Sequence, residues 1–249
     1  MNDFNPAYSR GRAGSLDMST DAGLRSFMLG VYNKLGLGLV ISGALAYLTS
    51  SVPPVRDLMY VTQGGAFAGY TPLGMVVNFA PLVLLFGSMF MMRNPSARGA
   101  NLLYWGVVAS IGASLGVLGL VYTGQSITQA FFITAASFFG LSLFGYTTKR
   151  NLTGMGSFLI MGVIGLIVAS IVNIFLQSPA LMFAISALGV LIFAGLIAYD
   201  TQRLKSMYAA TAGDSQAASV ATSFGALSLY INVINLFRFI LMFVGVARD

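Results

Sequence analysis

Long apolar runs separated by short polar segments fill the chain from residue 28 to residue 246. A helix that crosses a bilayer needs about 20 mostly apolar residues to span about 30 Å of hydrocarbon. Seven runs meet that requirement, at residues 28–50, 74–92, 101–122, 128–147, 153–176, 180–199 and 219–246. The pattern therefore predicts an all-α integral membrane protein in which seven transmembrane helices form one bundle.

Polar residues gather at the N-terminal end of the chain. Residues 1–24 are rich in Ser, Asp and Arg, and they lack the short apolar core and cleavage site of a secretory signal peptide. We therefore expect residues 1–24 to form a flexible polar cytoplasmic tail. Residues 25–249 are then the seven-helix transmembrane domain.

The composition limits the chemistry that the bundle can perform. Hydrophobic residues make up 57% of the chain and charged residues 8%, against about 25% charged in soluble domains. The chain has no Cys, His or Glu, so the usual zinc ligands and the His of a serine-protease triad are missing. No phosphate-binding glycine motif is present either. The sequence predicts no enzyme, no catalytic residues, no metal site and no cofactor.

Basic residues are distributed unevenly over the predicted loops. Nine lie in the tail and the even-numbered loops: Arg10, Arg12, Arg25, Arg93, Arg98, Lys149, Arg150, Arg203 and Lys205. The opposite side holds Arg56 and Arg248. Because cytoplasmic loops carry an excess of Lys and Arg, we expect a cytoplasmic N-terminus and an external C-terminus. The net charge of +6 is then an orientation signal, and no nucleic-acid partner is expected.

Three ionisable residues fall within or at the end of predicted spans, where such residues are rare and commonly functional. Asp200 closes the sixth span as a hydrated interfacial carboxylate or as a functional one. Lys34 either reaches the head groups or pairs with Asp200, and Arg238 lies in the outer half of the seventh span. Asn232 is near the middle of that span, where its amide must face the bundle interior, as a link between helices or as the lining of a polar path.

Four stretches together resemble a known family. They are Tyr122-Thr123-Gly124-Gln125-Ser126-Ile127, Gly145-Tyr146-Thr147-Thr148-Lys149-Arg150-Asn151-Leu152, Ala198-Tyr199-Asp200-Thr201-Gln202, and the run from Leu229-Tyr230 to Asn235-Leu236-Phe237. In combination they resemble the Bax inhibitor-1 family, also called the transmembrane Bax-inhibitor-motif proteins, and its bacterial members above all.

The resemblance implies a fold in which six helices surround a central seventh. It also implies a calcium leak or ion permeation that protonation gates in some members, and suppression of cell death in eukaryotes. Some bacterial members instead moderate a membrane-anchored ATP-dependent protease. A multi-pass protein of the cell inner membrane is the expectation, with membrane lipid, Ca²⁺ and a membrane-bound protease complex as the candidate partners.

The resemblance also selects the site residues. The family's proton sensor is a pair of aspartates, of which Asp200 matches the first, while Asn232 stands at the position of the second. Two carboxylates in one site repel each other and titrate as a coupled pair, whereas an Asn donates a hydrogen bond to an ionised Asp. We therefore predict weakened proton gating, with Asp200, Asn232 and Lys34 as gate candidates. Polar neighbours that line the path or pack between helices are expected at Tyr199, Thr201, Gln202 and Asn235.

Two functions follow from this sequence. The first is an ion leak whose path runs beside the seventh span. The second is a non-conducting membrane interaction protein that moderates a protease or another membrane complex, which the loss of the second aspartate favours.

Overall fold

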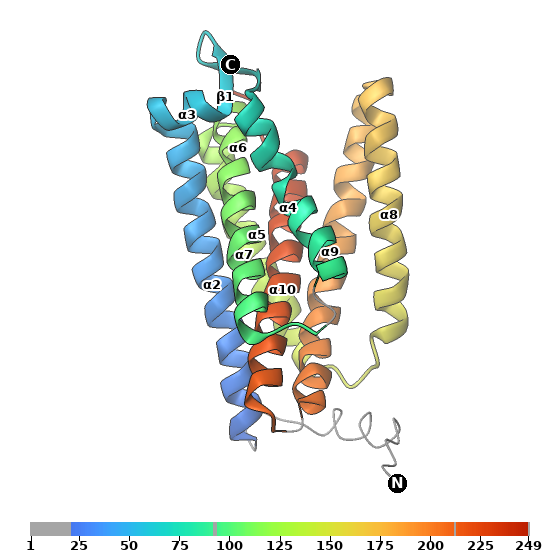
Figure 1. Cartoon of the computed structure of the whole chain (residues 1–249). Coiled ribbons are helices and arrows are strands. Elements are labelled where there is room, and N and C mark those ends of the chain that lie inside the picture. The colour runs from blue at the N-terminus through green and yellow to red at the C-terminus, as the bar shows by residue number, and fades with distance from the viewer. Residues whose placement is uncertain (1–20, 92–93, 212, 249) are drawn as a thin grey trace.

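The computed structural model describes residues 21–91, 94–211 and 213–248. This part of the chain contains seven helices long and apolar enough to cross a membrane, which confirms the predicted all-α bundle (Figure 1). The seven spans are α2 (Ala22–Ser51), α4 (Pro72–Met91), α5 (Ala97–Ser114) with α6 (Gly116–Val121), α7 (Gly124–Thr147), α8 (Thr153–Leu176), α9 (Pro179–Ala210) and α10 (Ser215–Val244). Between α2 and α4 lie the short helix α3 (Pro53–Met59) and the strands β1 (Tyr60–Gln63) and β2 (Ala66–Tyr70).

Side-chain caps fix where several spans begin. Asp21, Ser96 and Asp214 each accept a hydrogen bond from a backbone N–H in the first turn of α2, α5 and α10, where helical partners are lacking. Helix α2 therefore starts at Ala22, so the last three residues of the predicted tail are helical. The rest of that tail, residues 1–20, lies outside the described residues.

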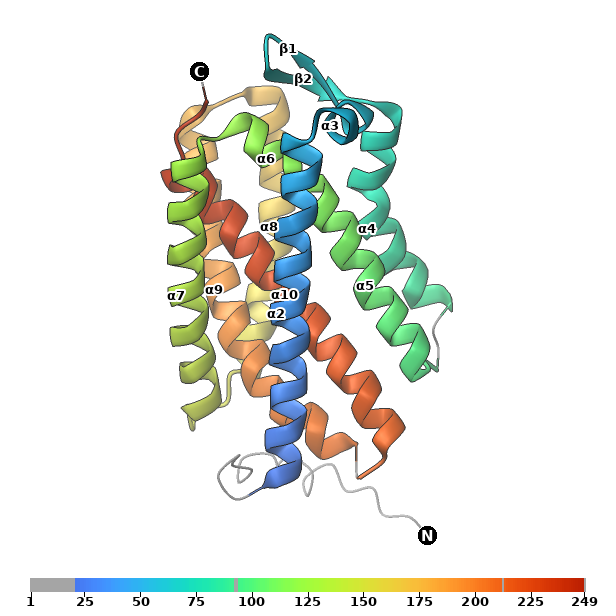
Figure 2. The ribbon, with the colours of Figure 1, turned by 90° about the vertical axis from the view of Figure 1, so that its left-hand side faces the viewer.

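Helix α10 is the central element of the bundle. Half of its most apolar stretch is buried, more than in any other described span. Helices α9, α2, α5 and α7 pack directly against it, while α4 packs mainly on α5 and α8 on α9. Figure 2 shows α10 crossing behind α2 through the middle of the molecule. The predicted arrangement around a central seventh helix is thus confirmed, with α4 and α8 at its periphery.

Two features hold α2 and the third span closely together. A Cβ atom added to Gly112 would lie 2.7 Å from the Cα atom of Ser42, so only a glycine permits this approach. The third span breaks at Leu115 into α5 and α6, and the backbone carbonyl of Ala113 accepts hydrogen bonds from Thr49 Oγ1 at 3.0 Å and Tyr60 Oη at 3.0 Å. Side chains thereby satisfy a polar backbone group at the break, as an apolar surrounding requires.

The long loop between the first two spans folds into a β-hairpin that the hydropathy pattern did not predict. Strands β1 and β2 pair antiparallel, with Tyr60 opposite Tyr70. Gly64 and Gly65 form the turn with φ angles of +60° and +86°, which suit the two-residue turn of a hairpin. The hairpin covers the end of the bundle at which the C-terminus also lies (Figure 2).

Helix α9 is longer than its apolar run, with 32 residues ending at Ala210. The prediction ended this span near residue 199 because charged residues follow Asp200. The helix continues because Thr201 and Leu204 are buried against neighbouring helices. Arg203 stays exposed, and the Lys205 ammonium donates to the backbone carbonyl of Tyr146. Asp200 therefore lies within a helix, nearly three turns before its end.

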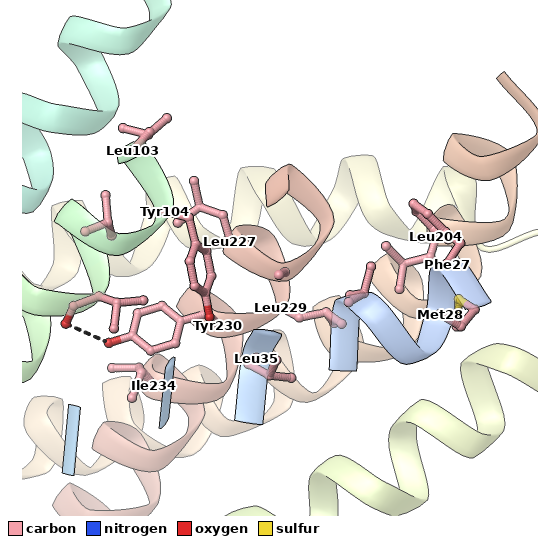
Figure 3. Close-up of a cluster of buried hydrophobic side chains, with 14 of the residues drawn as sticks. Phe27, Met28, Leu35, Leu103, Tyr104, Leu204, Leu227, Leu229, Tyr230 and Ile234 are labelled. Carbon is pink, nitrogen blue, oxygen red and sulfur yellow. Dashed lines mark hydrogen bonds between the residues drawn. The ribbon is translucent and has the colours of Figure 1, made fainter. Parts of the chain in front are cut away.

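A buried cluster joins α2, α5, α9 and α10 on one side of the central helix. Figure 3 shows the rings of Tyr104 and Tyr230 at its centre, with centroids 6.2 Å apart in an edge-to-face arrangement. The Tyr230 hydroxyl lies 2.6 Å from Ser42 Oγ. Buried phenols of this kind pair their polar end while burying a large apolar ring, so they fix the register of α10 against α2.

Candidate polar site between α9 and α10

Asp200 lies at the contact between α9 and the central helix. Its side chain is 6% exposed, and Ser228 and Asn232 of α10 both donate hydrogen bonds to its Oδ2 atom, the latter at 2.8 Å. Ser228 and Asn232 are four residues apart, so they share one face of α10. The structure thus brings together two of the three gate candidates that the sequence predicted, Asp200 and Asn232.

The second carboxylate oxygen has a different environment. Oδ1 of Asp200 lies 3.5 Å from Nη1 of Arg203, one turn further along α9. The Arg203 side chain is 42% exposed, so it is a weak ion-pair partner. Asp200 therefore has one oxygen held firmly by α10 and one oxygen screened by a cation that can move away.

The four residues from Tyr199 to Gln202 point to four different parts of the bundle. The Tyr199 ring packs on Gly156 of α8, while Asp200 faces α10. Oγ1 of Thr201 lies 3.3 Å from Oγ of Ser142 on α7. Gln202 contacts the loop between α7 and α8.

Gln202 binds that loop through both ends of its amide. Its Nε2 atom donates to the backbone carbonyl of Arg150, and its Oε1 atom accepts from the backbone N–H of Leu152, each at 2.8 Å. Polar residues that line a path or pack between helices were predicted at four positions. Of these, Tyr199 and Gln202 make contacts that hold neighbouring elements together. The motif around Asp200 and the segment ending at Asn151-Leu152 meet in space at this amide.

The predicted pair between Lys34 and Asp200 does not form. The Lys34 ammonium donates to Asn101 Oδ1 at 2.6 Å and to Ser223 Oγ at 2.8 Å, and it lies 5.0 Å from the Tyr104 ring centroid. Within the described parts of the chain, Arg203 is the cation within ion-pair distance of Asp200. Lys34 links α2, α5 and α10, since neutral polar side chains of those helices supply its acceptors.

The tyrosine beside Lys34 also contacts the single tryptophan of the chain. The Tyr104 hydroxyl donates to the Lys34 carbonyl at 2.6 Å, and the centroids of the Tyr104 and Trp105 rings are 4.9 Å apart. The third span and the first are thus joined here by the hydrogen bond of the Tyr104 hydroxyl and by the Lys34 ammonium over the Tyr104 ring.

Asn235 does not contact Asp200. Its Nδ2 atom donates to the carbonyl of Ile231 on its own helix at 2.9 Å, so its amide is satisfied locally. The polar site consequently extends over one turn of α10, from Ser228 to Asn232, and does not continue as a hydrogen-bonded chain to Asn235.

Comparison with known proteins agrees with this arrangement. The family model for inhibitors of apoptosis-promoting Bax1 matches residues 24–249. The chain belongs to the Bax inhibitor-1 family. The resemblance predicted from four short stretches is thereby confirmed over almost the whole chain.

Several bacterial proteins are similar to this chain along nearly their full length. A protein of Caulobacter vibrioides is 67% identical over 100% of both chains, and the Rickettsia prowazekii protein RP147 is 43% identical over 94% of this chain and 95% of its own. The inner membrane protein YbhL of Escherichia coli K12 is 36% identical over 91% of this chain and 94% of its own. With the seven apolar helices, these relatives confirm a multi-pass inner membrane protein.

The site contains two residues, Ser228 and Arg203, that the sequence analysis did not name as site residues. Ser228 donates to Asp200, and the spacing of four between Ser228 and Asn232 in an apolar span is the signal that identifies it. Arg203 was assigned to a loop because α9 was expected to end earlier. Its position three residues after Asp200 in a continuous helix is what places the two charges together.

Proposed function

We propose that this protein is a cation leak pathway of the inner membrane, that Ca²⁺ is its permeant ion, and that its gating by protons is weak. The observation that carries the proposal is the Asp200 carboxylate, buried between α9 and the central helix. An intramembrane carboxylate lowers the cost of bringing a cation into the bilayer and commonly marks an ion path.

The geometry of the carboxylate supports a closed state that can open. Oδ2 is engaged by two donors from α10, whereas Oδ1 faces the half-exposed Arg203 at 3.5 Å. Movement of Arg203 toward solvent frees an oxygen ligand, which is the type that Ca²⁺ prefers. Arg203 would then act as a tethered cation that competes with the permeant one.

The neighbour of Asp200 supports the weak proton dependence. Asn232 donates its amide hydrogen bond to Oδ2, and such a bond favours the ionised carboxylate. A carboxylate at that position would instead share protons with Asp200. The leak should therefore depend on Asp200 itself more than on the surrounding proton concentration.

Calcium flux into proteoliposomes tests the proposal. We expect the Asp200→Asn variant to lose most of the flux, because it keeps the shape of the side chain and removes its charge. Asp214→Asn is the matched control, since Asp214 caps α10 and asparagine caps helices equally well. Equal flux through the parent and Asp200→Asn would reject the role of Asp200 in the path, and no parent flux above empty liposomes would reject the leak.

The second candidate function is a non-conducting interaction protein that moderates a membrane-anchored ATP-dependent protease. Two observations favour it. Both oxygens of Asp200 are engaged within the protein, and Asn232 stands at the position that the resemblance assigns to the family's second aspartate. Deletion of residues 1–20 separates the two candidates. A leak keeps its flux after the deletion, whereas an interaction protein that uses this tail loses its captured protease.

A further inference from the structure

Arg238 is an exception on the central helix. Between residues 220 and 242, all of which the structure describes, every other side chain of α10 is buried or half-buried, while Arg238 is exposed. It lies six residues before the end of α10 at Val244, which corresponds to about 9 Å along the helix. A guanidinium at such a depth is costly unless an anion or water accompanies it.

Within the described residues, Arg238 has no hydrogen-bond acceptor and no ion-pair partner. Two other basic residues in or near the spans differ from it in this respect. Arg248 donates to the carbonyl of Gly119, and Lys34 has two acceptors. Arg238 thus offers a full set of N–H donors to something outside the protein.

Two tyrosines from other elements lie close to Arg238. Tyr70 ends β2 and Tyr122 precedes α7, and the ring of Tyr122 lies against Gly245, seven residues or about two helical turns after Arg238. Burial raises the pKa of Tyr70 and of Tyr122, so both remain neutral phenols at physiological pH. Neutral phenols supply O–H donors, and no acceptor for either hydroxyl occurs among the residues that the structure describes.

The positions of these tyrosines are well defined. Tyr70 packs on Phe67 and Tyr60, with ring centroids 5.0 and 5.8 Å away. The Tyr122 backbone pairs with Ala247, and its ring lies against Gly245, where an added Cβ would be 2.8 Å away. The three donor groups therefore sit on a fixed frame made by the hairpin, the start of α7 and the end of α10.

We propose that Arg238, Tyr70 and Tyr122 form a binding site for a phosphate group, supplied by the head group of an anionic phospholipid in the leaflet beside the β-hairpin. Guanidinium binds phosphate oxygens through two parallel hydrogen bonds, and tyrosines at this depth match the membrane interface. The site is independent of Asp200 and of the leak.

The test uses the full-length protein in a zwitterionic detergent. Short-chain phosphatidylglycerol and inorganic phosphate are titrated separately, with the melting temperature and the number of bound lipids in native mass spectrometry as readouts. We expect phosphatidylglycerol to bind Arg238→Gln roughly tenfold or more weakly than the parent, because a charge-assisted hydrogen bond is lost. Arg248→Gln, which removes an exposed arginine at the same end, should bind as the parent does.

Further variants separate the outcomes. Tyr70→Phe and Tyr122→Phe remove only a hydroxyl, so each should weaken binding less than Arg238→Gln. Binding of inorganic phosphate alone, lost in Arg238→Gln, supports the site with a soluble anion as its source. Equal phosphatidylglycerol binding by the parent and Arg238→Gln overturns the proposal. If Arg238→Gln fails to fold, unchanged binding in Tyr70→Phe/Tyr122→Phe overturns it instead.

Discussion

At the scale of single residues, Asp200 differs from an ordinary buried ion pair. Its most direct partners are the neutral donors Ser228 and Asn232, and its cationic partner Arg203 is the more distant and the more exposed. Hydrogen bonds from neutral donors favour the ionised form of a buried carboxylate, and no fixed cation cancels its charge here. This combination suits a site that a mobile cation visits.

Replacing Asn232 by Asp tests how this environment suppresses proton dependence. The new carboxylate would lie beside Oδ2 of Asp200, where the amide nitrogen is now 2.8 Å away. Two acids at that distance titrate as one coupled pair. We expect calcium flux through Asn232→Asp to change when the pH is varied between about 5 and 8, because two buried carboxylates in one site cannot readily both stay ionised, while flux through the parent changes little.

Asn235→Asp is the control for that experiment. It introduces the same acid three residues away, where the parent amide bonds to its own helix. Its flux should follow the pH profile of the parent. An unchanged profile for Asn232→Asp would contradict the assignment of Asn232 to the lost half of the sensor.

At the scale of secondary-structure elements, the turn from Tyr199 to Gln202 fixes the rotation of α9. Consecutive residues contact α8, α10, α7 and the loop before α8. Turning α9 by one residue would misplace all four contacts, since each step rotates a side chain by about 100°. The orientation of the Asp200 carboxylate toward α10 therefore depends on neighbours that take no part in ion binding.

Gln202→Ala is expected to release the loop between α7 and α8. Both backbone hydrogen bonds to Arg150 and Leu152 are lost, at a cost of about 1–2 kcal/mol. Cleavage by trypsin after Lys149 and Arg150 should then be roughly 5–30 times faster, because the open form is more populated. Gln216→Ala, at an exposed position of α10, should be cleaved there at the rate of the parent.

Much of the fold was predictable because a bilayer forces apolar runs into helices. The boundaries of the helices were less predictable. The span that ends at Ala210 was predicted to end at Asp200, because hydropathy alone does not show that Thr201 and Leu204 are buried. The hairpin was missed because strands of four and five residues leave little pattern, although Gly64-Gly65 is a turn signal.

The site was predictable only in part. The proximity of Asp200 and Asn232 followed from the family resemblance, and the structure contains it. Of the two alternatives for Lys34, the pair with Asp200 is not found, because the rotation of α2 directs the ammonium to Asn101 and Ser223. Long-range pairing of this kind depends on how helices face one another, which a single sequence does not contain.

At the scale of the whole molecule, several basic residues lie near one end of the bundle. Arg25, Arg98, Lys149 and Arg150 lie near the end at which α2 begins, and the β-hairpin lies at the other. Positive residues mark the cytoplasmic side in most membrane proteins. The cytoplasmic N-terminus and the external C-terminus remain predictions. They place the end with the basic residues in the cytoplasm and the β-hairpin outside.

Cysteine labelling in intact cells tests the orientation, since the chain contains no Cys. Gln63→Cys places a thiol at an exposed position beside the turn of the hairpin, and Asn151→Cys places one in the loop before α8. A membrane-impermeant maleimide should label the first in spheroplasts and the second only after lysis. The reverse pattern would invert the topology.

The contact between Trp105 and Tyr104 has an optical consequence. Because the chain has one tryptophan, its emission comes from a single place, beside the ring that faces the Lys34 ammonium at 5.0 Å. Any separation of α2 from α5 would change the quenching and polarity that this indole experiences. The protein thus carries a native fluorescent probe at the joint between its first and third spans, and a stopped-flow trace of the unlabelled protein would time that motion.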